Sequence, residues 1–308
     1  MQIKKPKVLP PHKGKRLHKT DQMHKKRRFR SALYIAPSVI GVLIFFVVPF
    51  AVVMYYSVIK NPISGEFVFL DNYLQIVKNG AFQTAVKNTL TFSLVAVPLA
   101  VVLSLMLAIV LEMKLPFRSQ FRTFFLSPLM VPIASVVLIW QVLFDYNGAV
   151  NDILLAFGGS RIDWFKSEYS HIVIVLLFLW KNLGYNMILF MAALASIPKD
   201  VIEVAKLESA SAFQTFFYIK IRYLSSTILF VTIMSLISSF KVFREIYLLT
   251  GDYPYDTLYM LQHYMNNMFG KLDYQKLSTA AILMSLVMVI LIGILFLTEK
   301  WFGKDVEG

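Results

Sequence analysis

The chain consists largely of six long apolar runs separated by shorter polar stretches. A membrane-spanning helix needs about 20 predominantly apolar residues, because the hydrocarbon core of a bilayer is about 30 Å thick. The runs predict six spanning helices, near residues 32–57, 89–111, 123–144, 172–196, 224–249 and 277–298. The first run is too long for the apolar part of a signal peptide and lacks a small-residue cleavage site after it. The pattern therefore predicts an all-α membrane protein.

The composition agrees with a membrane protein and excludes cysteine-based sites. Of the 308 residues, 57% are hydrophobic and 16% are charged, which does not fit a water-soluble surface. The chain has no cysteine, so it can hold neither a disulfide framework nor a thiolate metal site.

The net charge of +13 is concentrated at the N-terminus, where residues 1–30 hold twelve Lys and Arg against Asp21 alone. Such a tail either lies on anionic lipid or binds nucleic acid. Its attachment to a span at residue 32 favours lipid over nucleic acid. We predict a basic, disordered tail over residues 1–30, followed by a six-helix membrane domain over residues 31–308.

Lys and Arg also indicate the orientation of the helices, since loops on the cytoplasmic side carry more of them. The tail, the loops 112–122 and 197–223 and the C-terminus together hold 21 of these residues, whereas the alternate loops hold 7. Both termini are therefore predicted to be cytoplasmic.

No catalytic constellation is present. The phosphate-binding loop of ATPases, the His-Glu-x-x-His motif and the Gly-x-Ser-x-Gly motif are all missing from the sequence. Within the six predicted spans, Glu245 is the one acidic residue. Because ion-coupled carriers usually hold their ion with an acid at membrane depth, this disfavours an ion-coupled mechanism.

The 197–223 segment is too regular for a simple connector and predicts two short helices. Pro198 suits the first turn of one helix, and Ser211 with Gln214 forms a capping box that begins a second. The small run Ser209-Ala210-Ser211 would be the elbow between them. A short amphipathic helix can lie in the lipid headgroup layer or fit a groove on a partner protein, and periodicity alone favours lipid.

The residues of this segment carry a family resemblance. Glu203-Val-Ala-Lys-Leu-Glu-Ser-Ala210, followed by Phe216 and Ile219, resembles the Glu-Ala-Ala loop of permeases of bacterial binding-protein-dependent ABC importers. Shorter matches to the carbohydrate-importer branch occur in the same order along the chain. They are Leu70-Asp-Asn-Tyr73, Asn88-Thr89, Pro128 to Pro132, Trp140, Gly148-Ala-Val-Asn151, Ser196-Ile-Pro198, Phe240-Lys-Val-Phe243 and Leu249 to Pro254.

The resemblance implies a type I ABC importer permease fold, in which the loop is a coupling helix between the fourth and fifth spans that docks onto an ATPase. It assigns this contact to Glu203, Ala205, Lys206, Glu208, Ser209, Ala210 and Phe216. Ser209 stands where the family usually has Gly, so the elbow is expected to be tighter or differently turned. Val204, Glu208 and Arg222 also depart from the usual Ala, Asp and Pro.

A solute crossing the bundle needs polar and aromatic side chains at membrane depth. By the resemblance, the substrate-pathway residues are Asn182, Tyr185, Ser235 and Ser239. Each also has an ordinary structural explanation, because intramembrane Ser often packs between helices and Tyr often anchors a span at the interface. Lys181, Lys241 and Arg244 can extend toward the headgroups, and Lys241 can pair with Glu245 one turn away.

The resemblance implies a multi-pass subunit of the bacterial cytoplasmic membrane that imports a sugar or oligosaccharide. ATP and Mg²⁺ would be bound by two separate ATPase subunits, and the chain itself would hold no cofactor and no metal. The other implied partners are a second, related permease and an extracytoplasmic solute-binding protein. The alternatives are another cargo (an amino acid, phosphate or a polyamine), an ATP-independent secondary carrier, and a purely structural membrane subunit.

Overall fold

The computed structural model describes residues 34–113 and 116–302, with side chains described as far as residue 300. The chain falls into two compact units that divide between Tyr55 and Tyr56. The basic tail predicted over residues 1–30 lies outside the described residues. The predicted domain boundary at residues 30 and 31 therefore stays a prediction.

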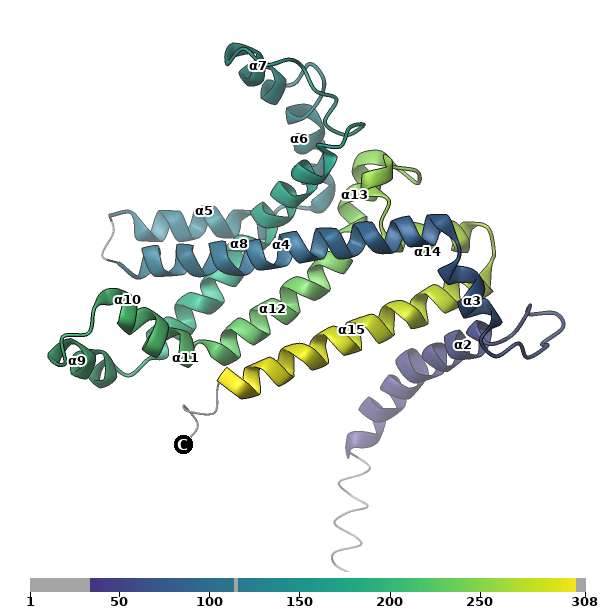
Figure 1. The fold of residues 1–308 in the computed structure, drawn as a ribbon, viewed down its shortest axis with the longest axis horizontal. Coiled ribbons are helices and arrows are strands. Elements are labelled where there is room, and N and C mark those ends of the chain that lie inside the picture. Colours follow the sequence, from purple (N-terminus) through teal and green to yellow (C-terminus); the bar gives the residue numbers. More distant parts are fainter. Residues whose placement is uncertain (1–33, 114–115, 303–308) are drawn as a thin grey trace, which may run out of the picture. The chain divides into compact units, whose positions relative to one another are not determined.

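The fold is helical throughout the described residues, which contain no strand and a single isolated bridge between Ile59 and Phe67 (Figure 1). The first unit holds the π-helical turn η1 (Leu43–Val47) and most of α2 (Val48–Ser57). The second unit holds α3 (Asp71–Val77), α4 (Gly80–Glu112), α5 (Arg118–Met130), α6 (Ile133–Leu143), α7 (Ala149–Ala156), α8 (Ser170–Ser196), α9 (Lys199–Leu207), α10 (Ala212–Gln214), η2 (Thr215–Lys220), α11 (Ile221–Tyr223), α12 (Ser225–Phe240), α13 (Phe243–Thr250), η3 (Asp256–Leu258), α14 (Leu261–Gly270) and α15 (Tyr274–Phe302).

Five helical stretches are long and apolar enough to cross a bilayer, and the bent pair α5–α6 makes up to six. The five are Tyr34–Ser57, Gly80–Glu112, Ser170–Ser196, Ser225–Thr250 and Tyr274–Lys300. These stretches confirm the predicted all-α membrane fold. The second begins nine residues before the predicted boundary, because Asn79 caps it by accepting a hydrogen bond from the Phe82 N–H (3.0 Å).

The third predicted span is not one continuous helix. Its two parts, α5 and α6, meet at an angle of 103°. Val131, between them, has an extended backbone, as expected for a residue that precedes proline, and Pro132 caps α6. The bend therefore follows from Pro132, whereas Pro128 is accommodated inside α5.

The centre of the second unit is the contact of α4 with α8 and α12 (Figure 1). Every fourth residue of α4 is small and fully buried along one stripe. The stripe consists of Ala96, Ala100, Ser104 and Ala108. Small side chains at this spacing let two membrane helices approach closely, so the stripe explains why α4 rather than α15 lies at the centre.

A close approach also joins α5 to α8. A Cβ atom on Gly184, in the middle of α8, would overlap the carbonyl oxygen of Phe125 and lie 2.6 Å from its carbonyl carbon. Only glycine leaves room for the α5 backbone at this point.

Several polar residues that mark the family resemblance tie loops to helix ends. The Asn88 amide donates to the backbone carbonyls of Asp256 (2.5 Å) and Tyr259 (3.1 Å), and Thr89 Oγ1 accepts from the Leu261 N–H (2.8 Å). These contacts attach α4 to the chain that leads from α13 into α14.

Two more asparagines act in the same way. Asn72 donates to the carbonyls of Ser57 (3.0 Å) and Ile59 (2.8 Å). The fully buried Asn151 donates to the Ile162 carbonyl (2.8 Å) and accepts from Trp164 Nε1 (3.0 Å), which closes the loop between α7 and α8. Asn72 and Asn151, which belong to the motifs shared with the family, thus stabilise the fold through these hydrogen bonds.

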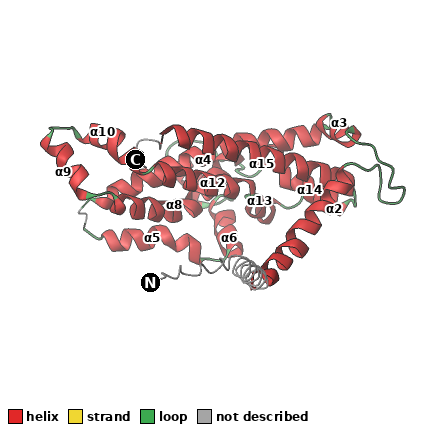
Figure 2. Ribbon diagram, turned by 90° about the horizontal axis from the view of Figure 1, so that it is seen from below, coloured by secondary structure: helices red, strands yellow, loops and turns green. Residues whose placement is uncertain are grey.

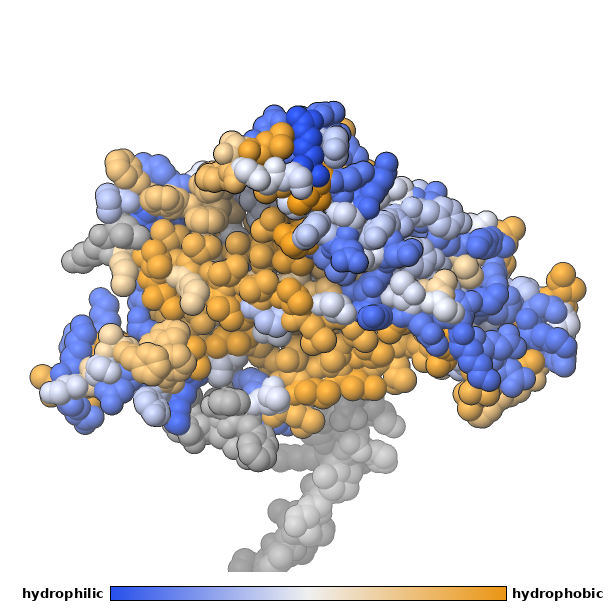
Figure 3. Space-filling model, turned by 45° about the horizontal axis from the view of Figure 1, so that its top comes forward, coloured by the Kyte–Doolittle hydropathy of each residue, from blue (hydrophilic) through white to orange (hydrophobic). Residues whose placement is uncertain are grey.

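The two ends of the second unit differ in their elements. In Figures 1 and 2, α9 and α10 lie at one end, and α3 and α14 lie at the other. Apolar side chains form a broad orange area across the face shown in Figure 3, and hydrophilic residues gather toward its edges. A broad apolar surface of this kind fits contact with a membrane.

The α14 helix contains a buried histidine that should make stability depend on pH. His263 Nδ1 accepts a hydrogen bond from the Met260 N–H (3.3 Å), and its Nε2 has no partner. Burial lowers the pKa of His263 from 6.5 to about 4. The unfolded chain therefore binds a proton between these pH values, whereas the folded chain does not.

We expect the free energy of unfolding to be unaffected by His263 above about pH 6.5 and to fall as the pH drops toward 4. At about 1.4 kcal/mol per pKa unit, the full loss approaches about 3 kcal/mol. Denaturant titration of the detergent-purified protein between pH 7.5 and 4 measures it. If the free energy of unfolding of His263→Gln depends on pH as steeply as that of the wild type, His263 is not the group responsible.

Candidate functional site

The 197–223 segment folds into the two predicted helices. The first is α9, the second runs through α10, η2 and α11, and α9 and α10 lie at one end of the second unit (Figure 2). Helix α9 begins after Pro198 and packs against η2, with Ala205 as its one buried residue. The other residues expected to contact an ATPase are exposed or half-buried. Glu203, Lys206, Glu208 and Ser209 are exposed, and Ala210 and Phe216 are half-buried.

The elbow after α9 is a tight helix C-terminus. The Ala210 N–H donates to the Ala205 carbonyl (2.9 Å) and the Ser209 N–H to the Lys206 carbonyl (3.1 Å), which together form a Schellman motif. Ser209 has a φ of +58°. Serine thus takes the left-handed conformation that glycine adopts without strain, so the departure from the family's glycine leaves the elbow under strain.

Replacing Ser209 with glycine should stabilise the elbow. The left-handed conformation costs an L-residue about 1 kcal/mol, which glycine does not incur. We expect local opening of residues 205–214 to become about fivefold rarer in Ser209→Gly, measured by hydrogen exchange. Ser209→Ala is the matched control and should change little; equal protection in both variants would contradict the explanation.

The second helix begins with the predicted capping box, which is confirmed. Ser211 Oγ accepts from the Gln214 N–H (3.2 Å), and Gln214 Oε1 accepts from the Ser211 N–H (2.8 Å). The chain continues through η2 and α11 almost directly into α12, since the Leu224 N–H donates to the Lys220 carbonyl (3.0 Å). Lys220 Nζ also forms an ion pair with Glu112 at the end of α4 (2.8 Å). This helix is therefore continuous with α12 and held to the end of α4 by an ion pair.

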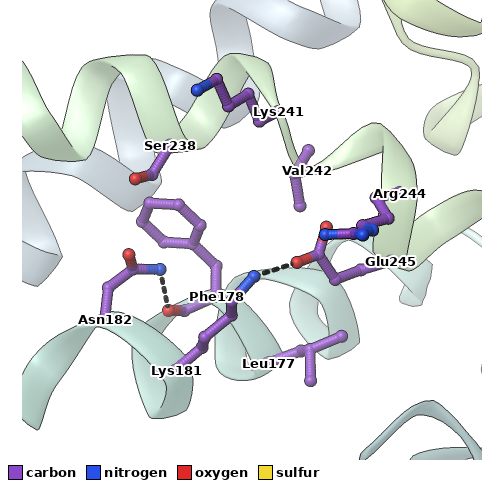
Figure 4. Close-up of a pocket in the computed structure, with 9 residues that line it drawn as sticks. All are labelled: Leu177, Phe178, Lys181, Asn182, Ser238, Lys241, Val242, Arg244 and Glu245. Atoms are coloured by element: carbon purple, nitrogen blue, oxygen red, sulfur yellow. Dashed lines mark hydrogen bonds and ion pairs between the residues drawn. The ribbon is translucent and has the colours of Figure 1, made fainter. Parts of the chain in front are cut away.

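A polar cavity of about 160 Å³ lies between α8 and the junction of α12 with α13 (Figure 4). Its lining combines four charged side chains with two neutral polar ones and three apolar ones. They are Lys181, Lys241, Arg244 and Glu245, then Asn182 and Ser238, then Leu177, Phe178 and Val242.

The cavity forms where the fifth span is interrupted. Helix α12 ends at Phe240 and α13 begins at Phe243. Across the junction the backbone bonds are of the shorter, three-residue kind, such as Lys241 N–H to Ser238 carbonyl (3.1 Å) and Glu245 N–H to Val242 carbonyl (3.1 Å). The interruption turns Glu245 toward α8.

Glu245 pairs with Lys181 across the cavity, as the dashed line in Figure 4 marks. The expected local pair of Glu245 with Lys241 does not form. The Glu245 side chain is only 6% exposed, and its Oε2 atom has no hydrogen-bond partner. A buried carboxylate oxygen without a donor is costly and is a natural acceptor for a ligand hydroxyl.

The four predicted substrate-pathway residues are not gathered at one place. Asn182 lines the cavity, where its amide donates to the Phe178 carbonyl (2.8 Å). Tyr185, one turn further along α8, is exposed and outside the lining. Ser235 and Ser239 are buried between helices: Ser235 accepts from the Asn186 amide (3.0 Å), and Ser239 bonds with Ser93 (2.8 Å).

The four residues assigned to the pathway by resemblance do not include the charged members of the cavity lining. Lys241 and Ser238 also count among the polar candidates of the fifth span, but extension to the headgroups accounts equally well for Lys181, Lys241 and Arg244. The available signal was their position, because charged residues inside a span usually face a cavity or a pathway. Within the described residues, no cluster of three or more His, Asp or Glu could hold a metal ion.

Comparison with known proteins decides the family. Residues 100–307 match the model of the binding-protein-dependent transport system inner membrane component. The chain belongs to this family. It is therefore a multi-pass transport subunit, and the match includes both the 197–223 segment and the cavity.

Relatives of known function resemble this permease over most of its length. The trehalose/maltose transport system permease protein MalF of Thermococcus litoralis is 28% identical over 290 residues, which cover 91% of this chain and 98% of the relative. The sn-glycerol-3-phosphate transport system permease protein UgpA of Yersinia pseudotuberculosis is 28% identical over 281 residues, covering 89% and 95%.

The fold also matches a solved structure. The crystal structure of a bacterial ABC transporter involved in the import of the acidic polysaccharide alginate aligns with a TM-score of 0.75 and 21% identity. The alignment covers 91% of this permease and 98% of that chain. The permease therefore has an ABC importer permease fold.

Proposed function

We propose that this permease imports a sugar or oligosaccharide as one transmembrane subunit of an ATP-driven ABC importer. The observation that carries the proposal is the family match over residues 100–307, together with relatives named for the transport of trehalose and maltose, of lactose and of arabinooligosaccharides. A polar cavity between two spanning stretches supports a solute pathway.

The proposed partners are a second, related permease, two cytoplasmic ATPase subunits that bind ATP and Mg²⁺, and an extracytoplasmic solute-binding protein. A solved relative is an alginate ABC transporter in complex with an alginate-bound periplasmic protein, which supports the last of these. The distribution of Lys and Arg supports cytoplasmic termini in the bacterial cytoplasmic membrane and, with them, a cytoplasmic 197–223 segment.

The connection between the 197–223 segment and the cavity gives a route by which ATP binding to the ATPases would change the shape of the cavity. The 197–223 segment connects α8 to α12. Helix α8 carries one wall of the cavity, and the end of α12 with its junction to α13 carries the opposite wall. In α9, Asp200 and Glu203 are exposed near the helix N-terminus, where a basic residue of an ATPase could pair with them. Closure of the ATPases would move this segment and so shift the two walls relative to each other, which is a change of population between cavity states.

Uptake by proteoliposomes tests the proposal. Vesicles containing this permease, its partner permease and the ATPases should take up radiolabelled sugar when ATP is enclosed and the binding protein is added outside. Omitting the ATPases should abolish uptake. Uptake driven by a proton or sodium gradient without ATPases would instead support a secondary carrier, and no uptake of any solute would support a structural subunit.

A further inference from the structure

The cavity between α8 and α13 carries more positive than negative charge. Three cations line it, Lys181, Lys241 and Arg244, against the single carboxylate of Glu245. Lys181 is already paired with Glu245. Lys241 and Arg244 have no ion pair or side-chain hydrogen bond with any other described residue, so the lining has an excess of two positive charges.

Lys241 and Arg244 are exposed in the single chain, but their place within the bilayer makes unpaired charge costly. They belong to the spanning stretch Ser225–Thr250, where low-dielectric surroundings disfavour charge unless a counter-charge or water is present. Both residues also line the cavity, which extension toward the headgroups alone does not explain. A cavity of about 160 Å³ holds water when empty, so the charges are hydrated until an anion replaces the water.

The neutral groups of the lining fit the rest of a sugar. Asn182 and Ser238 can form hydrogen bonds with hydroxyl groups, and the unpartnered Oε2 of Glu245 can accept a hydrogen bond from one hydroxyl. The ring of Phe178 offers an apolar face beside them (Figure 4). Glu245 does not reverse the charge preference, because Lys181 neutralises it.

We propose that the sugar carried by this permease is acidic, and that Lys241 and Arg244 bind its carboxylate, phosphate or sulfonate group during passage. The inference rests on the proposed sugar function and adds the charge class of the cargo. The competing explanation is that the two cations pair with acidic residues of the partner permease when the complex assembles.

Matched pairs of disaccharides test the proposal. Cellobiose and maltose are each compared with the uronic acid in which one primary alcohol is oxidised to a carboxylate, using proteoliposomes of the complete importer with its own binding protein. We expect the acidic member of at least one pair to be imported at least about tenfold faster than its neutral partner. Since the binding protein also selects cargo, the variants below isolate the contribution of the cavity.

Lys241→Gln and Arg244→Gln should each lower uptake of the acidic disaccharide at least about tenfold while the complex still co-purifies with its ATPases. Lys241→Arg keeps the charge and should lose less uptake than Lys241→Gln. Lys271→Gln removes an exposed lysine from the turn between α14 and α15 and is the matched control, with no expected change.

The cargo's charge and the sugar function can fail separately. Equal or faster import of the neutral members overturns the acidic cargo and leaves the sugar function standing. Loss of complex assembly in both glutamine variants also overturns it, in favour of pairing with the partner permease, as does unchanged acidic uptake in both. No ATP-driven import of any sugar overturns the proposed function and this inference with it.

Discussion

Replacing Glu203 with lysine is expected to lower ATP-driven uptake at least about tenfold without reducing the amount of permease in the membrane. Glu203 is exposed on α9, one turn from the helix start, and its neighbours do not pair with it. Reversing its charge would set two cations against each other at the proposed ATPase contact, and a disrupted interfacial charge pair costs about 2–5 kcal/mol. Radiolabelled uptake and co-purification of the ATPases measure the effect.

The matched control is Glu168→Lys, which makes the same charge change at an exposed residue of the loop before α8, far along the chain from α9. It should leave uptake and ATPase binding unchanged. If both variants behave alike, the effect comes from net charge rather than from α9. If Glu203→Lys transports normally, the 197–223 segment does not make the proposed contact through this carboxylate.

Gly184→Ala is expected to lower the free energy of unfolding by about 3 kcal/mol. The new Cβ would overlap the Phe125 carbonyl, and because the neighbour is backbone, α5 must move away from α8 as a whole. Overpacking of this kind typically costs about 1–3 kcal/mol, and the overlap here is severe. Denaturant titration of the detergent-purified protein measures the change.

Gly293→Ala in α15 gives a control with the opposite sign. A Cβ on Gly293 meets nothing within 4 Å, so the substitution should be neutral or stabilising by up to about 1 kcal/mol through higher helix propensity. Equal losses in the two variants would mean that glycine matters for the flexibility of the helices and not for the approach of α5 to α8.

The sequence was most informative where a local rule decides the structure. Apolar length located the spanning stretches, and the Ser211 and Gln214 capping box located the second helix of the 197–223 segment, because both signals act within a few residues. The bend between α5 and α6 could have been predicted from Pro132, since proline removes a backbone donor and forces the preceding residue into an extended conformation.

Two features could not be predicted from local sequence patterns, because they depend on contacts between residues distant in sequence. The interruption of the fifth span at Lys241 and Val242 involves neither proline nor glycine. Glu245 had a local partner available in Lys241, yet it pairs with Lys181, which lies 64 residues away. Ser235 and Ser239 were chosen as pathway residues for their hydroxyls, but their direction was set by Asn186 and Ser93 on neighbouring helices.

The interruption of the fifth span has a mechanical meaning. Helix α12 is held along α4, while α13 continues into the loop that Asn88 and Thr89 fasten to the same helix near its beginning. Both arms of the junction at residues 241 and 242 are thus fixed to α4, at two points along its length. The bracing on both sides of the break keeps Glu245 opposite Lys181, so the ion pair depends on the position of α8 relative to α4.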